Sequence, residues 1–213
     1  MKNIIIWGKG RLASHLALLC EEENISYETI GKGRLPSKTA QCVIDFSHPG
    51  ALEDLLSYCA KYQTPLLIAT TGHSAQQIEL IELFSRQIPL CCDSNFSLGV
   101  LALKKAVKAL NSLLSGWDTE IVEAHRKAKA DAPSGTALSL SRLFDAPPPI
   151  HSVRAGDLAG EHTLIYASRG EKMTLTHEAF TPIIFAKGAL FCAKKLINMP
   201  NGLYSAQDLF EVK

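Results

Sequence analysis

The N-terminal half of the sequence alternates between short apolar runs and longer stretches with one apolar face, and this alternation constrains the fold more than any other feature. Short continuous apolar runs are typical of strands that are buried on both faces of a parallel sheet. Amphipathic stretches between them predict crossover helices, so the fold is expected to be α/β with a doubly wound parallel sheet. The expected strands are Met1–Trp7, Ser26–Ile30, Cys42–Phe46, Pro65–Ala69 and Pro89–Cys92, and the expected helices are Arg11–Glu23, Ala51–Tyr62 and Ala75–Ser85.

A different pattern begins at Ile150, where apolar and polar residues alternate. Alternation of this kind is typical of strands with one covered face. It predicts a second, smaller α+β domain with a mixed sheet, and Ser168–Glu171 is expected to be a hairpin turn within it. The expected strands are Ser152–Ala155, Glu161–Ser168 and Lys172–Glu178, and the remaining helices are 100–114, Ser134–Phe144 and Ile184–Ile197.

The first expected strand ends in a glycine-rich turn with the pattern G-x-G-x-x-A, and a helix follows it. Strand, glycine turn and helix form the context that a dinucleotide fingerprint needs, because the glycines let the backbone approach a pyrophosphate at the helix N-terminus. The sequence therefore predicts a Rossmann-type domain that binds NAD(P). The residues expected to contact the cofactor here are Gly8, Lys9, Gly10, Arg11 and Leu12.

The end of the second expected strand bears on the choice between NADPH and NADH. An acidic residue there binds the ribose hydroxyl of NAD, whereas basic residues accommodate the 2′-phosphate of NADP. Glu28 lies too early in the strand for the first role, and Lys32 and Arg34 follow the strand end. The sequence therefore favours NADPH and leaves NADH open as a second cofactor, with solvated loop charges as the alternative interpretation of the two cations.

Three further turns follow the carboxyl ends of expected strands. Ligands bind at this edge of a doubly wound sheet, so these turns are expected to converge with the glycine turn on the cofactor. The residues predicted to contact the cofactor from them are Phe46, Ser47, Thr70, Thr71, Gly72, Asn95 and Phe96.

The stretch Glu120–Ala137 runs from an expected strand through a basic loop into a helix start. His125 ends the strand, and histidine is the residue type whose unperturbed pKa permits proton transfer near neutral pH. Ser134 can cap the helix, and the N–H groups of a helix start attract anions. The loop therefore predicts a pocket for an anion, most simply a carboxylate, although a solvated basic loop is the alternative interpretation. The residues of this predicted pocket are Arg126, Lys129, Ser134, Gly135 and Thr136.

Composition and charge exclude several classes of protein. The formal net charge of +1 lacks the basic excess of a general nucleic-acid binder, and no apolar run approaches the roughly 20 residues that span a bilayer. The N-terminus enters its first strand with no signal-peptide pattern. The six cysteines are scattered without a C-x-x-C pair, which favours reduced core thiols and a cytoplasmic protein. The seven histidines show no metal-ligand spacing, so no metal is expected.

The sequence resembles the dihydrodipicolinate reductase family at Glu120–Ala137, which reads E-I-V-E-A-H-R-K-A-K-A-D-A-P-S-G-T-A. The family signature is a Glu-rich strand followed by His-His-x-x-Lys-x-Asp-x-Pro-Ser-Gly-Thr-Ala. Further motifs in the same order make the resemblance specific across nearly the whole chain. They are Gly8–Ala13, Asp45–Ser47, Thr70–Gly72, Asn95–Val100, Arg154–Asp157, Gly160–Thr163, His177 and Phe185–Ala189.

The resemblance implies an NAD(P)H-dependent reduction of dihydrodipicolinate, or of its 4-hydroxy precursor, to tetrahydrodipicolinate in lysine and diaminopimelate biosynthesis. By match of motif, His125 and Lys129 are the acid–base pair, Lys129 also contacts the substrate, and the backbone at Gly135 and Thr136 binds a substrate carboxylate. The implied assembly is a homotetramer joined through the sheet of the substrate domain. The implied domains are residues 1–97 with 182–213 for the dinucleotide, including the last helix, and 98–181 for substrate binding and oligomerisation.

Three features depart from the family pattern. Arg126 stands at the second histidine, Thr181-Pro182 stands where relatives carry Ser-Arg, and the segment between Leu143 and Ile150 is short. An arginine can pair with a carboxylate but cannot donate a proton at neutral pH. These departures leave two other hypotheses open, a non-catalytic NAD(P)-binding regulatory relative and a reductase of another small dicarboxylate or semialdehyde. Retention of both His125 and Lys129 favours the reductase.

Overall fold

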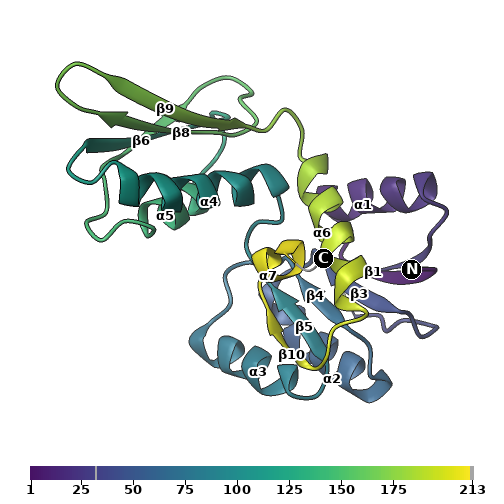
Figure 1. Ribbon diagram of the computed structural model, residues 1–213. Coiled ribbons are helices and arrows are strands. Elements are labelled where there is room, and N and C mark those ends of the chain that lie inside the picture. The colour runs from purple at the N-terminus through teal and green to yellow at the C-terminus, as the bar shows by residue number, and fades with distance from the viewer. Residues whose placement is uncertain (32, 212–213) are drawn as a thin grey trace. The chain divides into compact units, whose positions relative to one another are not determined.

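The structure is a computed structural model that describes residues 1–31 and 33–211 (Figure 1). The chain divides into two compact units, one made of Met1–Ser97 with the chain from Ile183 onward, and one made of Leu98–Pro182. Lys32, which the sequence places near the cofactor, lies outside the described residues. Each unit has its own sheet and its own hydrophobic core.

The first unit is built on a parallel sheet with the strand order β10-β5-β4-β3-β1-β2. This order, which extends in both directions from the first strand, confirms the predicted doubly wound α/β fold. Strands β1 to β5 lie where the apolar runs predicted them. The strands are β1 (Asn3–Trp7), β2 (Ser26–Ile30), β3 (Cys42–Asp45), β4 (Leu66–Ile68), β5 (Pro89–Cys92) and β10 (Gly202–Tyr204).

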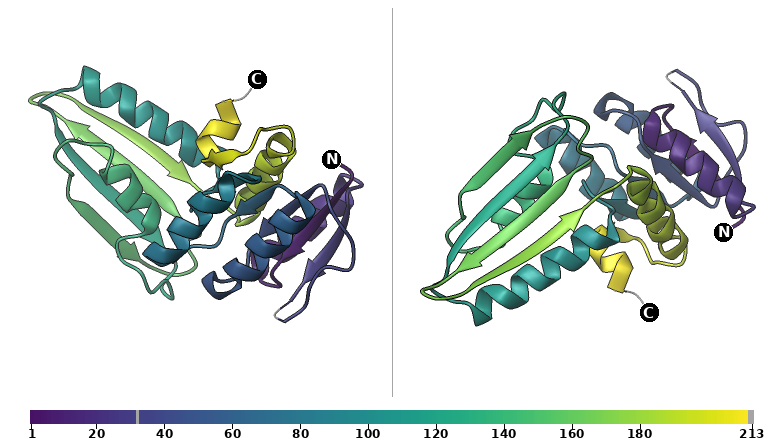
Figure 2. Two further views of the ribbon diagram at one scale, coloured as in Figure 1. Left: turned by 90° about the horizontal axis from the view of Figure 1, so that it is seen from below. Right: turned by 90° about the horizontal axis from the view of Figure 1, so that it is seen from above.

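Helices cover both faces of this sheet (Figures 1 and 2). On one face α1 (Arg11–Glu22) packs against α6 (Ile183–Leu196), which also contacts β3, β4 and β5. On the other face lie α2 (Leu52–Tyr62), preceded by the 3₁₀ turn η1 (Pro49–Ala51), and α3 (Ala75–Ser85). The last long helix therefore packs on this parallel sheet.

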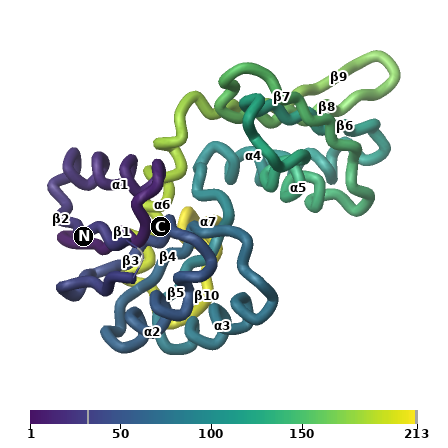
Figure 3. The backbone as a smooth tube through the Cα atoms, turned by 180° about the vertical axis from the view of Figure 1, so that it is seen from behind, coloured from purple at the N-terminus to yellow at the C-terminus, as the bar shows by residue number. Residues whose placement is uncertain are grey.

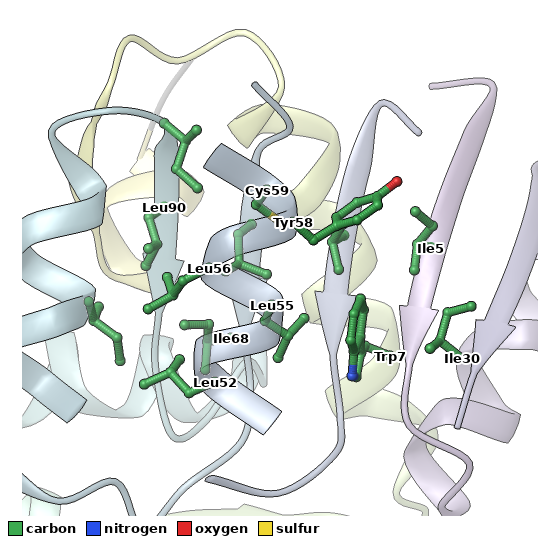
Figure 4. Packing of buried hydrophobic residues seen from close by; sticks show 14 residues of the cluster. Ile5, Trp7, Ile30, Leu52, Leu55, Leu56, Tyr58, Cys59, Ile68 and Leu90 are labelled. Carbon is green, nitrogen blue, oxygen red and sulfur yellow. The ribbon is translucent and has the colours of Figure 1, made fainter. Parts of the chain in front are cut away.

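The core between this sheet and α2 is formed by alternate residues of the strands (Figure 4). Ile5 and Trp7 of β1 point toward Leu55 and Tyr58 of α2, because side chains two apart on a strand share a face. Buried apolar area contributes roughly 25 cal/mol per Å², so these side chains stabilise the sheet that carries the turns of the predicted cofactor site.

The sequence did not predict β10, and the end of α5 differs from the prediction. β10 has only three residues and no apolar run, and its pairing with β5, Gly202 opposite Pro89, defines it. A short helix, α7 (Ala206–Glu211), follows it. Helix α5 (Gly135–Ser141) ends before the predicted Phe144 because the chain tightens there into a turn, with a bond from the N–H of Leu143 to the carbonyl of Leu140.

The second unit has a four-stranded mixed sheet, as predicted, with the order β7-β6-β8-β9. Strand β7 runs parallel to β6, whereas β8 is antiparallel to both β6 and β9. Helices α4 (Leu98–Leu113) and α5 lie on one face of this sheet (Figure 3). The strands are β6 (Asp118–His125), β7 (Ile150–Arg154), β8 (Glu161–Ala167) and β9 (Lys172–Glu178).

The covered face of this sheet changes character along its length. On β8, Leu164 and Tyr166 lie in the apolar core beneath α4 and α5, together with Ile121 of β6. Further along the same face, the buried residues of β6 are Glu123 and His125. Since strand side chains alternate between faces, Glu123 and His125 point to the same face of the sheet as the core residue Ile121.

All six cysteines are free thiols, and all except Cys92 are buried, in agreement with the predicted core role. Burial raises the pKa of Cys20 and Cys92 to about 11, which keeps them protonated at neutral pH. Within the described part of the chain, no helix has both the length and the apolar character needed to cross a membrane.

Candidate active site

The polar end of the four-stranded sheet joins side chains from all four strands. Glu123 on β6 lies opposite His162 on β8, and His162 in turn lies opposite His177 on β9. At the end of β6, His125 lies opposite Arg154 of β7. The strand register therefore brings together the predicted histidine and three groups that are far from it in the sequence.

Glu123 is at the centre of these polar side chains and has no solvent-accessible surface. Arg154 donates one hydrogen bond to each carboxylate oxygen, at 2.9 and 2.7 Å. His125 Nδ1 lies 2.5 Å from Oε2 of Glu123, and the N–H of Ser134 donates to Oε1 at 3.3 Å. Arg154 also donates to the carbonyl of Asp131 at 2.6 Å, so the pair ties two strands to the loop that follows β6.

The partners of Glu123 determine its charge. Burial raises the pKa of its carboxyl, but hydrogen bonds from Arg154, Ser152 and His125 outweigh burial and bring the pKa to about 2. Glu123 is therefore ionised at neutral pH and only accepts hydrogen bonds. The neighbouring His162 behaves in the opposite way, because burial, followed by the charge of His125, lowers its pKa to about 4 and keeps it neutral.

The loop after β6 holds the two predicted cations. Arg126 is exposed, and the half-buried Lys129 donates from Nζ to the carboxylate of Asp131 at 2.7 Å. This hydrogen bond lowers the pKa of Asp131. Backbone bonds fix the loop, from the N–H of Lys127 to the carbonyl of Gly156 and from the N–H of Lys129 to the carbonyl of Arg126.

Ser134 caps α5, as its position before the helix predicted. Its Oγ accepts a hydrogen bond from the N–H of Ala137 at 3.2 Å and lies 3.0 Å from Nε2 of His162. Its own N–H donates to Glu123. Both polar groups of the buried Ser134 are thus engaged inside the protein, so its role is to place the helix start, where Gly135 is exposed to solvent.

Gly160 lies against the imidazole of His125. A Cβ added at Gly160 would be 3.2 Å from Nε2 and 3.4 Å from Cδ2 of His125, closer than an ordinary van der Waals contact allows. The backbone of Gly160 also has a φ of +150°, which favours glycine. A side chain at this position would crowd the ring nitrogen that Glu123 leaves unbound.

Sequence reasoning gave no chemical role to Glu123, Arg154 or His162. One signal was available, because the period of two along β6 puts Glu123 on the same buried face as Ile121 and His125. A carboxylate on a buried face needs a cationic partner, and Arg154 supplies it. Among the described residues, no group of three His, Cys, Asp or Glu side chains could hold a metal ion.

The first unit contains a cavity of about 510 Å³ at the carboxyl ends of β1, β2 and β3. Of the residues predicted to contact a cofactor, Gly8, Lys9, Gly10, Arg34, Phe46 and Ser47 line it. The walls also include residues that the sequence analysis did not assign to the cofactor, among them Trp7 and Asp54. Glu28 does not line the cavity, and its carboxylate accepts hydrogen bonds from the N–H and the hydroxyl of Ser37.

The glycine turn has the geometry that a dinucleotide needs. Gly8 has a φ of +128°, and an added Cβ would lie 2.4 Å from the carbonyl oxygen of Phe46, so no other residue fits there. Gly10 precedes α1 with no side-chain cap, and a Cβ added there would meet no atom of the described residues within 4 Å. The N-terminus of α1 is therefore open to a pyrophosphate group.

The other predicted cofactor residues lie outside the lining of this cavity. They are Arg11, Leu12, Thr70, Thr71, Gly72, Asn95 and Phe96. Thr70 contacts a residue of the cavity lining, because its Oγ1 accepts a hydrogen bond from the N–H of Ser47 at 3.1 Å. Phe96 is 2% exposed, and a Cβ on Gly188 of α6 would lie 1.7 Å from its carbonyl oxygen. These contacts place Phe96 in the packing of α6 against the sheet.

Comparison with known proteins covers almost the whole chain. Residues 11–96 match the family described as "Dihydrodipicolinate reductase, N-terminus", and residues 99–210 match "Dihydrodipicolinate reductase, C-terminus". The chain is 45% identical to the 4-hydroxy-tetrahydrodipicolinate reductase of Xanthomonas campestris pv. campestris (strain B100), over 98% of this chain and 97% of that protein. It is 33% identical to the enzyme of the same name from Exiguobacterium sp. (strain ATCC BAA-1283 / AT1b), over 98% and 96%.

Among solved structures, the fold is similar to dipicolinate-bound dihydrodipicolinate reductase from Paenisporosarcina sp. TG-14, with a TM-score of 0.79. The identity to that protein is 18%, over 96% of this chain and 97% of that one, so this likeness concerns the fold. Together with the full-length sequence relatives, the matches to both halves of the family show that the chain belongs to the dihydrodipicolinate reductase family.

Proposed function

We propose that this protein uses NADPH to reduce 4-hydroxy-tetrahydrodipicolinate, or dihydrodipicolinate formed from it, to tetrahydrodipicolinate in lysine and diaminopimelate biosynthesis. Family membership supports the reaction class. The observation that carries the assignment to this chain is the hydrogen bond between His125 Nδ1 and the buried, ionised Glu123, which leaves Nε2 of His125 available for proton transfer.

The reduction needs a hydride at one ring carbon and a proton at the adjacent position. NADPH supplies the hydride when it is bound, and His125 and Lys129 are the proposed acid–base pair for the proton. Lys129 is half-buried, and Asp131 holds its ammonium group by a hydrogen bond at 2.7 Å. General acid–base catalysis is typically worth about 10²–10⁴-fold in rate, so loss of either group is expected to abolish most turnover.

The substrate is a dicarboxylate, and the proposed contacts for its carboxylates lie around the start of α5. The backbone N–H groups of Gly135 and Thr136 are proposed to bind one carboxylate, with Arg126 and Lys129 as cationic partners. Ser134, predicted as a direct contact, is instead proposed to hold this helix start in place through its bonds to Glu123 and His162.

The cavity of the first unit fits the proposed cofactor. Gly8 and Gly10 admit the pyrophosphate at the N-terminus of α1, and the adenosine ribose is proposed to lie near Gly31. Two cations stand in the cavity wall, Arg34 and Lys9, whose side chain lies against Gly31. These cations, with Glu28 engaged by Ser37, support a preference for NADPH over NADH.

We also propose the assembly and the division of roles. The unit Leu98–Pro182 carries the substrate site, and the other unit carries the cofactor site. Within the unit Leu98–Pro182, α4 and α5 lie on one face of the four-stranded sheet, and the opposite face is the proposed contact of a homotetramer. The free thiols of the buried cysteines suit a reducing compartment, which supports the cytoplasm as the site of action.

The proposed reaction is tested by following oxidation of NADPH, and separately of NADH, with freshly synthesised product of dihydrodipicolinate synthase. Protein-dependent oxidation that is faster with NADPH is expected. Equal rates with the two cofactors would keep the reductase and reject the NADPH preference. No oxidation, with NADPH still bound in a fluorescence titration, would reject the catalytic assignment.

Two variants sharpen this test. Lys129→Ala is expected to lose at least about 10²-fold in turnover with NADPH binding nearly unchanged, whereas Lys127→Ala, an exposed neighbour in the same loop, is expected to match the wild type. Arg34→Ala is expected to weaken NADPH binding about 10-fold, as loss of a charge-assisted phosphate contact implies, and to leave NADH binding unchanged. Near wild-type turnover of Lys129→Ala would show that the loop is wrongly assigned.

A further inference from the structure

Glu123 is fully buried and forms an ion pair with the half-buried Arg154. Glu123 has no exposed surface, and Arg154 bonds to both of its carboxylate oxygens. Isolated buried ions are costly, and even a well-formed pair of this kind is weak evidence for stability. Stability therefore does not explain why this ion pair lies at the edge of the site.

The second partner of Glu123 supplies that reason. Oε2 lies 2.5 Å from Nδ1 of His125, and an ionised carboxylate can only accept at that position. Nδ1 must therefore carry a proton whether the imidazole is neutral or charged. In the neutral ring, the proton is absent from Nε2, and the tautomer is fixed before any ligand binds.

The contacts around the ring also fix its direction. Nδ1 faces Glu123, and the Nε2 edge faces Gly160, where an added Cβ would come within 3.2 Å. The ring of His162 packs edge-on at a centroid distance of 5.3 Å. The imidazole is therefore held on three sides, and Nε2 is the ring nitrogen that does not bond to Glu123.

The same ion pair holds the loop that contains Lys129. Arg154 donates to the carbonyl of Asp131, and Glu123 accepts from the N–H of Ser134. Both ends of the segment that leads from the loop into α5 are thus bonded to one buried pair. A change that removes both oxygens of Glu123 would release the histidine and this segment together, whereas a glutamine keeps one oxygen that can accept from Arg154 and Ser134.

We propose that Glu123, held ionised by Arg154, is the positioning residue of the acid–base site, which sets the tautomer and orientation of His125 so that Nε2 is the proton-transferring nitrogen. This inference rests on the proposed function for the role of His125. The tautomer itself is a property of the protein without ligands, so it can be measured independently of turnover.

The first experiment is ¹⁵N NMR of the protein labelled with [¹⁵N]histidine, without ligands, with His125 assigned by comparison with a His125→Asn variant. At a pH where the imidazole is neutral, wild-type His125 is expected to carry its proton on Nδ1. Glu123→Gln is expected to move a measurable fraction to the Nε2-protonated form, because an amide NH₂ facing Nδ1 requires an acceptor there. A wild-type His125 protonated on Nε2 would overturn the proposal.

The second experiment separates positioning from folding by kinetics. Glu123→Gln is expected to lower kcat by about 10²-fold, within the range of general acid–base catalysis, with KM and the Kd for NADPH changed less than about threefold. Glu123→Asp keeps the charge on a shorter side chain and is expected to recover part of kcat. Unchanged kcat in Glu123→Gln would overturn the proposal even if the wild type is a confirmed reductase.

The chain provides a matched control on the same two strands. Glu120 and His151 form an exposed pair between β6 and β7 at 2.7 Å, and Glu120→Gln is expected to leave both kcat and the His125 tautomer unchanged. If Glu123→Gln does not fold, the double variant Glu123→Gln/Arg154→Met removes the unpaired guanidinium and gives the same tautomer test. An inactive wild type with the Nδ1-protonated tautomer would reject the proposed function and leave the geometric inference standing.

Discussion

Two carboxylates are buried beside the two proposed sites, one in each unit, and their surroundings differ. Glu123 is 0% exposed and Asp45, at the end of β3, is 1% exposed. Glu123 is bonded to a guanidinium, whereas Oδ1 of Asp45 accepts from the N–H and hydroxyl of Ser47. The other oxygen of Asp45 has no hydrogen-bond partner among the described residues.

Equal burial therefore has opposite consequences for the two acids. Burial raises the pKa of Asp45, and hydrogen bonds from Ser47 and Thr70 offset this only in part. Burial also raises the pKa of Glu123, but the bonds from Arg154, Ser152 and His125 reverse the shift and bring it to about 2. Hydroxyl partners leave a buried charge unfavourable, whereas a bidentate cation makes it stable enough to orient other groups.

The largest expected effect is that of removing the paired acid. Glu123→Ala leaves the half-buried guanidinium of Arg154 without its carboxylate, and we expect a loss near the lower end of the about 3–5 kcal/mol of unfolding free energy that breaking a buried pair costs. Urea unfolding monitored by circular dichroism measures the loss. Glu120→Ala, which removes an exposed acid from the same strand, is expected to change stability by less than about 0.5 kcal/mol. Equal losses in the two variants would show that the Glu123–Arg154 pair contributes no more to stability than the exposed Glu120 does.

A glycine in each proposed site, Gly8 in the first unit and Gly160 in the second, leaves no room for a side chain. Substitution of Gly8 is expected to have the larger effect on stability. Gly8→Ala would place a Cβ 2.4 Å from the backbone oxygen of Phe46, and backbone cannot move aside as a flexible side chain can. Gly8 also has a φ of +128°, which an alanine rarely adopts. We expect a loss of about 2–3 kcal/mol and no detectable NADPH binding. Gly10→Ala, where an added Cβ meets open space, is expected to cost less than about 1 kcal/mol. Thermal unfolding of both variants tests the difference.

Gly160→Ala tests the same idea in the second unit with a softer neighbour. Its Cβ would meet the imidazole of His125 at 3.2 Å, so we expect about 1–2 kcal/mol of lost stability and about a 10-fold fall in kcat. Gly170→Ala in the β8–β9 hairpin is the control, since it has a φ of +119° and no atom near the added Cβ. A similar loss of kcat in both variants would show that the fall in kcat of Gly160→Ala does not come from its contact with His125.

The smallest expected effect at neutral pH is that of neutralising Asp45. Its folded-state pKa is raised above the ordinary 3.8, so its stabilising contribution is complete below that value and is lost as pH rises through the folded-state pKa. Asp45→Asn removes this loss, so we expect stability at pH 7 to change by less than about 1 kcal/mol or to increase. A large destabilisation at pH 7 would show that the ionised form of Asp45 is needed.

Glu123 is expected to give the opposite pH dependence. Its pKa falls from 4.5 to about 2 on folding, so its contribution is complete above 4.5 and is lost as pH falls from there toward 2. The wild type should therefore be more stable than Glu123→Gln at neutral pH and lose this advantage in acid, whereas any advantage of Asp45→Asn over the wild type should appear as pH rises through the folded-state pKa of Asp45. Unfolding free energies measured from about pH 3 to about pH 8 compare the two slopes.

Local pattern predicted most of the first unit because each of its signals is contained in a short stretch. Four residues of continuous apolar character before Gly8 fix a buried strand, and the glycine pattern fixes the turn that follows. The strand β10 escaped prediction because Gly202–Tyr204 has no pattern of its own and exists through pairing with β5. The seven predicted cofactor residues outside the cavity lining show a similar limit, since turns at one sheet edge need not line one cavity.

In the second unit the sequence determined which residues carry charge but not which of them meet. His125, Lys129 and the helix start at Gly135 lie within one stretch, so their proximity could be predicted from it. Arg154 is far from Glu123 in the sequence, and only the parallel register of β6 and β7 places it against that carboxylate. Ser134, predicted to contact the substrate, has its hydroxyl directed inward, 3.0 Å from Nε2 of His162 on β8.

The sequence by itself therefore determined the fold class, the family and the polar loop, because periodicity, turn chemistry and ordered motifs are local properties of the chain. Tertiary structure decided the ionisation of Glu123 and Asp45 and the orientation of His125. The physical reason is that burial and partners set the cost of a charge, and both come from strands that meet only in the folded protein.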